Sequence, residues 1–87
     1  MSATVHVTVR YFASIREAIG QGSESMDTTA HTMAELRDSL MARGAPYNDV
    51  LARGRAVRMA LNQTLCDESA TLNMGDEVAF FPPVTGG

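Results

Sequence analysis

Residues 4–12 read TVHVTVRYF, and apolar and polar side chains alternate along most of the stretch. Successive side chains of a strand point to opposite faces of a sheet, so alternation with a period of two predicts a strand. One predicted face carries Val5, Val7, Val9 and Tyr11. The other carries His6, Thr8, Arg10 and Phe12. The stretch therefore predicts a strand half buried against a hydrophobic core.

A second apolar strand is predicted at residues 77–81, which read EVAFF and follow a turn at residues 73–76, NMGD. Val78 and Phe80 share one face of this strand, and Ala79 and Phe81 share the other. Because these two strands are the most apolar of the chain, we expect both to lie centrally in one sheet and to run parallel to each other.

The short segments that follow the first strand indicate a helix and an edge strand. Residues 14–17 read SIRE, a capping-box pattern that predicts the start of a short helix ending before Gly20. Residues 23–28 are polar and alternate only weakly, which is typical of a strand at the edge of a sheet.

The main helix is predicted from a second capping box, TMAE at residues 32–35. Met33, Leu36 and Leu40 recur at the helical period and form one apolar stripe. We expect Arg43 in the last turn and Gly44 at the C′ position.

Pro46 prevents continuation of this helix, and residues 47–52 are compatible with a short helical turn. Residues 55–62 alternate again and predict a strand with Val57, Met59 and Leu61 on one face. Asn62 and Gln63 then predict a tight turn into a short strand at residues 64–65, and residues 67–74 predict a loop or a single helical turn.

This order of elements predicts an α+β protein with the β-grasp, ubiquitin-like fold: a mixed sheet packed against one main helix. Residues 1–81 would form the β-grasp domain, and residues 82–87 an extended, flexible Gly-Gly tail. A chain of 87 residues leaves no room for a second domain.

Composition narrows the possible partners. The net charge of −3 and a pI near 5.1 argue against nucleic acid. All seven basic residues are Arg, so the chain cannot form an isopeptide bond to a lysine of its own copy. No apolar run is long enough to cross a membrane, and the N-terminus alternates, so we expect a cytoplasmic protein.

The sequence contains few candidates for a metal site or a catalytic group. Cys66 is the only cysteine, which excludes an internal disulfide and a thiolate cluster. His6 and His31 lack metal-ligand spacing, and no phosphate loop or nucleophile elbow is present. We expect no metal and no stably bound cofactor, which leaves the C-terminal carboxylate as the candidate reactive group.

The last residues, FPPVTGG at 81–87, suit the delivery of that carboxylate. Pro82 and Pro83 cannot donate a backbone hydrogen bond and favour an extended conformation. Gly86 and Gly87 have no Cβ, so the backbone could enter a slot too narrow for a side chain. Six residues could reach roughly 20 Å from Phe81.

A carboxylate is a poor electrophile and must be activated, for example as an acyl-adenylate made from ATP. A sulfur donor could then displace AMP and leave a thiocarboxylate, which is a good nucleophile. Such a protein would be a consumable reagent rather than a catalyst.

The whole chain resembles the small, sulfur-carrying subunits of molybdopterin synthase, the MoaD/ThiS-type ubiquitin-like family. The resemblance rests on VRYFASIRE at residues 9–17, NQTL at residues 62–65 and GDEVAFFPPVTGG at residues 75–87. Between residues 20 and 55 it rests on the pattern of elements only.

The resemblance implies that Gly87 is adenylated by a ubiquitin-activating-type enzyme, which consumes ATP, and becomes a thiocarboxylate. A desulfurase or a rhodanese would supply the sulfur. The tail would then enter the large synthase subunit and donate sulfur to cyclic pyranopterin monophosphate, two deliveries completing the dithiolene of molybdopterin. Two large and two small subunits would form a heterotetramer.

The resemblance also implies a docking surface for the large subunit and the activating enzyme. Its apolar residues here would be Phe12, Leu65 and Phe81, and Phe12 and Phe81 fall on the predicted faces away from the main core. The tail would add the partner contacts Pro82, Pro83, Val84 and Thr85.

Three alternatives remain open at this point. The same chemistry could serve thiamine or cysteine synthesis or tRNA thiolation. The chain could instead be a ubiquitin-like modifier joined through Gly87 to a target lysine. It could also be an interaction module with an inert tail.

Overall fold

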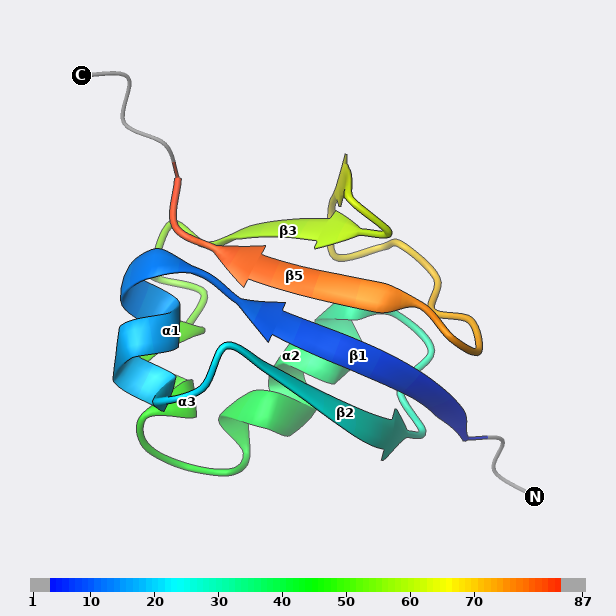
Figure 1. The fold of residues 1–87 in the computed structure, drawn as a ribbon, viewed down its shortest axis with the longest axis horizontal. Coiled ribbons are helices and arrows are strands. Elements are labelled where there is room, and N and C mark those ends of the chain that lie inside the picture. Colours follow the sequence, from blue (N-terminus) through cyan, green and yellow to red (C-terminus); the bar gives the residue numbers. More distant parts are fainter. Residues whose placement is uncertain (1–3, 84–87) are drawn as a thin grey trace.

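The structure is a computed structural model that describes residues 4–83 (Figure 1). The described chain contains, in order, β1 (Val5–Tyr11), α1 (Ala13–Ile19), β2 (Ser23–Thr28), α2 (Met33–Met41), α3 (Tyr47–Val50), β3 (Arg58–Leu61), β4 (Thr64–Cys66) and β5 (Glu77–Phe81). This is the predicted order of elements. For the segment between β4 and β5 the sequence predicted a loop or a single helical turn, and the structure has a loop.

The strands form one mixed sheet in the order β2-β1-β5-β3-β4. β1 and β5 run parallel, with Val9 opposite Val78, and the other pairs are antiparallel. Both apolar strands have a neighbour on each side, which confirms their predicted central position, and β2 lies at an edge as expected. Figure 1 shows α2 crossing behind the sheet and α1 and α3 at the end where β1 and β5 finish. The fold is therefore an α+β, ubiquitin-like β-grasp.

The core lies between the sheet and α2. The stripe Met33, Leu36 and Leu40 is completely buried and confirms the predicted helical face. From the sheet, the fully buried side chains are Val7, Val9, Tyr11, Val78 and Phe80. Each of these five sits on the strand face that alternation assigned to the core.

The predicted cap of α2 is confirmed at Thr32, whose Oγ1 accepts from the N–H of Glu35 over 3.3 Å. The Glu35 carboxylate accepts from the N–H of His31 over 2.7 Å, one residue before the position that an ideal capping box uses. Both bonds stabilise the start of the helix that covers the sheet.

The predicted capping box at residues 14–17 is wrong. Phe12 is the N-cap residue of α1, in extended conformation and with no side-chain cap, and Ser14 lies inside the helix. The reason is strand pairing: Phe12 is still tied to β5 through its N–H, and the chain turns at once at Ala13, whose φ is 53°. The helix ends at Ile19 with Gly20 in the left-handed region, at φ 90°, as its predicted end requires.

The C-terminal end of α2 also differs from the prediction. The helix ends at Met41 with Ala42 as C-cap, so Arg43 lies beyond its last turn. Gly44 has φ 89° and donates its N–H to the Met41 carbonyl over 3.1 Å, one position later than expected. The predicted helical turn that follows is α3, which is two residues shorter than the predicted span.

β3 begins at Arg58 rather than at residue 55. Arg58 pairs with Phe81, the last residue of β5, so the residues before it have no strand to pair with. The predicted hairpin turn is confirmed: Asn62 and Gln63 have φ values of 51° and 69°, as a type I′ turn requires.

Sequence patterns did not indicate the burial of Arg37, whose side chain is 6% exposed on α2. Its Nε donates to the carbonyl of Leu51 over 2.6 Å, and its Nη2 donates to the carbonyl of Ala52 over 3.0 Å. Glu68 lies 3.7 Å from its Nη1 and also accepts from Arg53 over 2.8 Å. These bonds join α2 to the chain that follows α3 and to the loop after β4.

Candidate functional site

The outer face of the sheet, opposite the core, carries a strip of apolar side chains. The strands contribute Phe12, which follows β1, Ala79 and Phe81 from β5, Ala60 from β3 and Leu65 from β4. Cross-strand register explains the grouping, because Ala60 pairs with both Ala79 and Leu65, and paired residues point to the same face. Phe12 is 40% exposed and Leu65 is 68% exposed.

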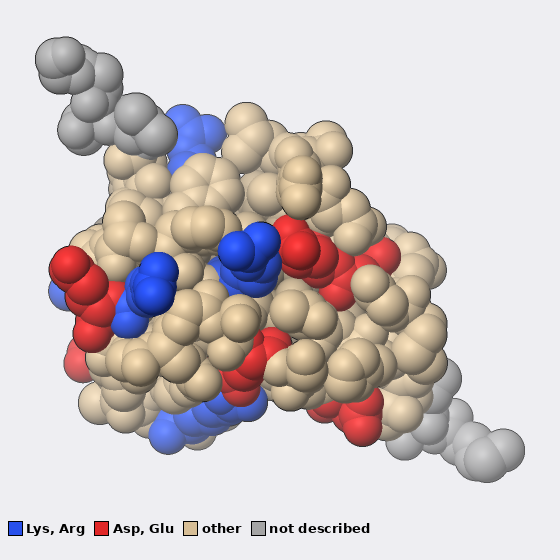
Figure 2. All heavy atoms as spheres, in the orientation of Figure 1, with Lys and Arg blue, Asp and Glu red and all other residues tan. Residues whose placement is uncertain are grey.

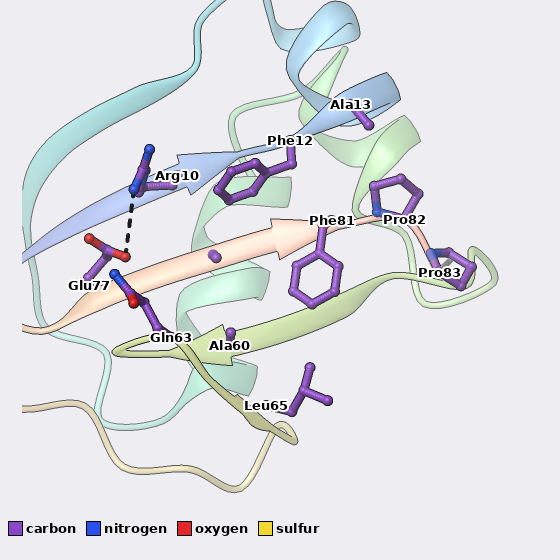
Figure 3. A pocket seen from close by; sticks show the side chains of 11 residues that line it. Arg10, Phe12, Ala13, Ala60, Gln63, Leu65, Glu77, Phe81, Pro82 and Pro83 are labelled. Carbon is purple, nitrogen blue, oxygen red and sulfur yellow. Dashed lines mark ion pairs between the residues drawn. The ribbon is translucent and has the colours of Figure 1, made fainter. Parts of the chain in front are cut away.

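These side chains line a hollow of ≈ 770 Å³, here called the sheet groove (Figure 3). Ala13 and the two prolines after β5 continue its apolar wall. Arg10, Gln63 and Glu77 line it with polar atoms. Single exposed apolar residues are common on protein surfaces, but a contiguous apolar groove of this kind often marks an interaction surface.

The structure brings together the predicted partner-binding residues that it describes. Phe12, Leu65, Phe81, Pro82 and Pro83 come from three separate parts of the sequence and all line the sheet groove. The other predicted site residues, Val84, Thr85, Gly86 and Gly87, lie outside the described residues. The groove therefore begins where the predicted tail leaves β5.

Strand pairing fixes the positions of Phe12 and Phe81, the two aromatic residues of the sheet groove. The N–H of Phe12 donates to the carbonyl of Phe80 over 3.2 Å, one residue before Phe81. This bond extends the β1–β5 ladder beyond the last residue of β1 and holds the two aromatic positions beside each other. The site thus sits on backbone that is anchored to the core, because Phe80 is completely buried.

The polar part of the groove was missed by sequence reasoning. Arg10 Nη1 lies 3.9 Å from Glu77 Oε2, and the Arg10 guanidinium lies 5.4 Å from the centre of the Phe12 ring. Glu77 is held by Asn62, which donates its N–H to the Glu77 carbonyl over 2.8 Å and accepts from the Glu77 N–H over 3.0 Å. The alternation in β1 already placed Arg10 on the face of Phe12, and this signal could have identified it.

The prolines after β5 border a second hollow on their other side. Its lining includes Ser14 and Ile15 from α1, Val50 from α3, and Arg55, Ala56 and Val57 from the chain before β3. Pro82 and Pro83 therefore line both hollows, and residues of the sheet, α1 and α3 surround the point where the tail begins.

The described residues 4–83 also contain one thiol, Cys66, and several ionisable side chains. Burial, with a smaller effect of Asp67, raises the pKa of the Cys66 thiol, which disfavours a nucleophilic thiolate. Between residues 4 and 83 no group of His, Cys, Asp and Glu could hold a metal ion. The same stretch contains no helix that is long and apolar enough to cross a membrane. Figure 2 shows the outer face of the sheet, where uncharged surface surrounds small groups of acidic and basic atoms.

Residues 9–87 match the ThiS family. The molybdopterin synthase sulfur carrier subunit of Escherichia coli is 38% identical over 81 residues, which cover 93% of this chain and 99% of that protein. The subunit with the same name from Haemophilus influenzae is 37% identical with the same coverage. A solved complex of subunits 1 and 2 of the molybdopterin-converting factor from Helicobacter pylori contains a chain that is 31% identical, with a TM-score of 0.65 over 95% of this chain and 100% of that one.

Proposed function

The chain belongs to the ThiS family, and on this premise we propose that it is the sulfur carrier subunit of a molybdopterin synthase. The single observation that carries the proposal is the position of the sheet groove. A surface suited to docking begins at Pro82 and Pro83, where a tail ending in Gly86-Gly87 leaves the sheet. The names of the relatives, which share more than a third of their residues with this chain, favour molybdopterin among the possible products.

Gly87 would carry the chemistry. A C-terminal carboxylate has a typical pKa of about 3.5, so it is ionised at neutral pH and resists attack. In the proposed cycle its oxygen attacks the α-phosphate of ATP on a ubiquitin-activating-type enzyme, and pyrophosphate leaves. The terminal sulfur of a persulfide on a desulfurase or a rhodanese then displaces AMP, so that a C–S bond replaces a C–O bond. A thiol cleaves the remaining S–S bond, which releases the thiocarboxylate and leaves a disulfide on the donor. The thiocarboxylate sulfur attacks cyclic pyranopterin monophosphate in the large subunit, and water then cleaves the bond between the Gly87 acyl group and the sulfur, which restores the carboxylate.

The folded part of the chain would position this group rather than catalyse a step. The sheet groove would hold the partner, and the prolines would direct the tail away from the sheet, since their φ is fixed. Two residues without a Cβ would then pass through a narrow channel. We place the cycle in the cytoplasm and expect no metal and no stably bound cofactor on this chain. The dithiolene contains two sulfurs, so two deliveries by recharged carriers would complete it. The synthase would be a heterotetramer of two large and two small subunits.

Reconstitution with the large subunit tests the proposal. A variant without Gly87, and one with a tag after Gly87, should transfer no sulfur to the pterin precursor, whereas a tag before Met1 should leave transfer unchanged. Circular dichroism should show the same fold in all three, because the core residues lie between Val7 and Phe80. Sulfur transfer by the variant without Gly87 would contradict the proposal. Conjugates on target lysines, without transfer to the pterin, would support the modifier instead.

A further inference from the structure

Two arginines flank β5 on the outer face of the sheet, and one of them, Arg10, lines the sheet groove. Arg10 of β1 pairs in register with Ala79, and Arg58 of β3 pairs with Phe81. Paired residues point to the same face, so both arginines share the outer face with the strip. In the strand order β1-β5-β3, β5 lies between them. The two arginine positions therefore lie on either side of the apolar surface that β5 contributes.

The charges of these arginines are only weakly compensated within the chain. The nearest carboxylate to Arg10 is that of Glu77, at 3.9 Å, and the Arg10 side chain is 45% exposed. Arg58 is exposed, and among the described residues no ion pair includes it. In contrast, Arg43 and Arg53 contact carboxylates at 2.9 Å and 2.7 Å. A chain with a net charge of −3 thus has two weakly compensated cations on the face of the sheet that carries the groove.

We propose that Arg10 and Arg58 select the partner at the sheet groove, and that the docking face of the large synthase subunit presents an apolar side chain flanked by carboxylates. This inference rests on the proposed function. Charge complementarity specifies the occupant, since a partner with basic residues at the same positions would meet two cations at close range. The sheet groove also adjoins the start of the tail at Pro82. A protein that binds Gly87 would therefore lie next to the groove, which favours the large subunit as the partner.

The chemistry of Arg10 favours a carboxylate over a neutral group. A guanidinium has five N–H donors, and the loose contact with Glu77 uses few of them. The group also lies 5.4 Å from the centre of the Phe12 ring, at the groove, where a partner's carboxylate could bind it through two parallel hydrogen bonds. Docking removes water from the groove, which strengthens this interaction and makes an unpaired Arg10 costly.

Before docking, both arginines are solvent-accessible and attract an oppositely charged partner, which raises the rate of association in a salt-dependent way. We therefore expect the double variant Arg10→Gln, Arg58→Gln to associate with the large subunit roughly tenfold more slowly at low salt. Raising the salt to about 0.5 M should slow the wild type towards the variant, because the Debye length shrinks to a few ångströms. Stopped-flow fluorescence of the full chain and the large subunit measures both rates.

Two control variants separate local from global charge. Arg10→Lys with Arg58→Lys keeps both charges and should keep most of the salt dependence. Ala34→Glu with Asn48→Asp lowers the net charge by the same two units, at the starts of α2 and α3, neither of which lines the sheet groove, and should associate within about twofold of the wild type.

The outcomes distinguish this inference from the proposed function. If the wild type binds and transfers sulfur while the Gln variant shows the same rate and the same salt dependence, the arginines do not select the partner and the proposed function stands. An equal loss in the Ala34→Glu, Asn48→Asp variant would also overturn the inference, since net charge alone would then act. If the wild type neither binds nor transfers sulfur, both fail.

Discussion

The backbone N–H of Phe12 donates to the carbonyl of Phe80 over 3.2 Å and joins the ends of two parallel strands that are far apart in the sequence. One residue further on, Phe81 faces the sheet groove from β5, and the Phe12 side chain faces it from the end of β1. The core residue Phe80 thus sets the position of both groove aromatics. A change in either groove aromatic, the exposed Phe12 or the half-buried Phe81, should alter docking and leave the core in place.

Phe81→Asp should weaken binding of the large subunit by about 2 kcal/mol or more, roughly thirtyfold, because docking would bury a charge among apolar groups. Isothermal titration measures the affinity. Ser25→Asp is the matched control: it adds the same charge on the outer face, at the edge strand β2 and away from the groove. Unchanged affinity for Phe81→Asp, or an equal loss for Ser25→Asp, would exclude Phe81 from the interface.

Sequence periodicity predicted much of this surface. Alternation in β1 and β5 placed Phe12 and Phe81 away from the core, and the structure confirms this because the fully buried side chains of the two strands are Val7, Val9, Tyr11, Val78 and Phe80. That Leu65 joins them depends on the register of β3 with β4 and β5, and strand order cannot be read from local pattern. The predicted cap at Ser14 was wrong for a similar reason: a hydrogen bond to Phe80, far away in the sequence, holds Phe12 extended, and local pattern does not show such a bond.

Arg37→Met should lower the free energy of unfolding by about 2–4 kcal/mol, since it leaves the carbonyls of Leu51 and Ala52 without a donor. Urea unfolding followed by circular dichroism measures the loss. Arg55→Met is the control, because Arg55 is exposed and its replacement should change stability by less than about 0.5 kcal/mol. Similar values for the two variants would show that Arg37 does not stabilise the fold in this way.

A buried arginine on the helix could not be predicted from the sequence. Arginine is a good helix former, and a charged residue in a helix is normally expected to be exposed to solvent. Its partners are backbone carbonyls after α3, which carry no sequence signal, and Glu68 in a loop. Only the packed arrangement of the three segments shows why a charge is tolerated there.

Two glycine substitutions should have opposite effects. Gly20 has φ 90° at the end of α1, and a Cβ there would meet no atom within 4 Å, so the cost of Gly20→Ala is conformational only. We expect a loss of about 1 kcal/mol. Gly54 also has open space, and its φ is outside the left-handed range, so Gly54→Ala should gain about 0.4–1 kcal/mol.

Urea midpoints of the two glycine variants, compared with that of the wild type, measure the effect. A loss of equal size in both would mean that backbone conformation is not what distinguishes the two positions. A gain for Gly20→Ala would contradict the left-handed conformation at the end of α1.

The phenol of Tyr11 should make stability depend on alkaline pH. Burial, followed by the hydrogen bond that it donates to Glu24 over 2.8 Å, raises the pKa of Tyr11 well above its ordinary value. The unfolded chain loses this proton near pH 10 and the folded chain keeps it. The contribution to stability is therefore complete below about pH 10 and falls as the pH rises above it.

The chain has no Lys, so few other groups titrate in this range. The raised pKa of Cys66 acts in the same direction, and a Cys66→Ser background removes it. In that background, Tyr11→Phe should lower stability at about pH 8 by loss of the hydrogen bond, and should reduce the further fall between about pH 9 and pH 11. An unchanged fall, measured by urea unfolding, would show that Tyr11 does not cause it.

The central claim is that Gly87 carries sulfur as a thiocarboxylate. The most direct test is the intact mass of the chain after incubation with ATP, the cognate activating enzyme and a sulfur donor, with fragmentation to locate the change. The account predicts a gain equal to the replacement of one oxygen by sulfur, located at Gly87 and absent without ATP. An unchanged Gly87, with an activating enzyme that releases pyrophosphate on this chain, would contradict it.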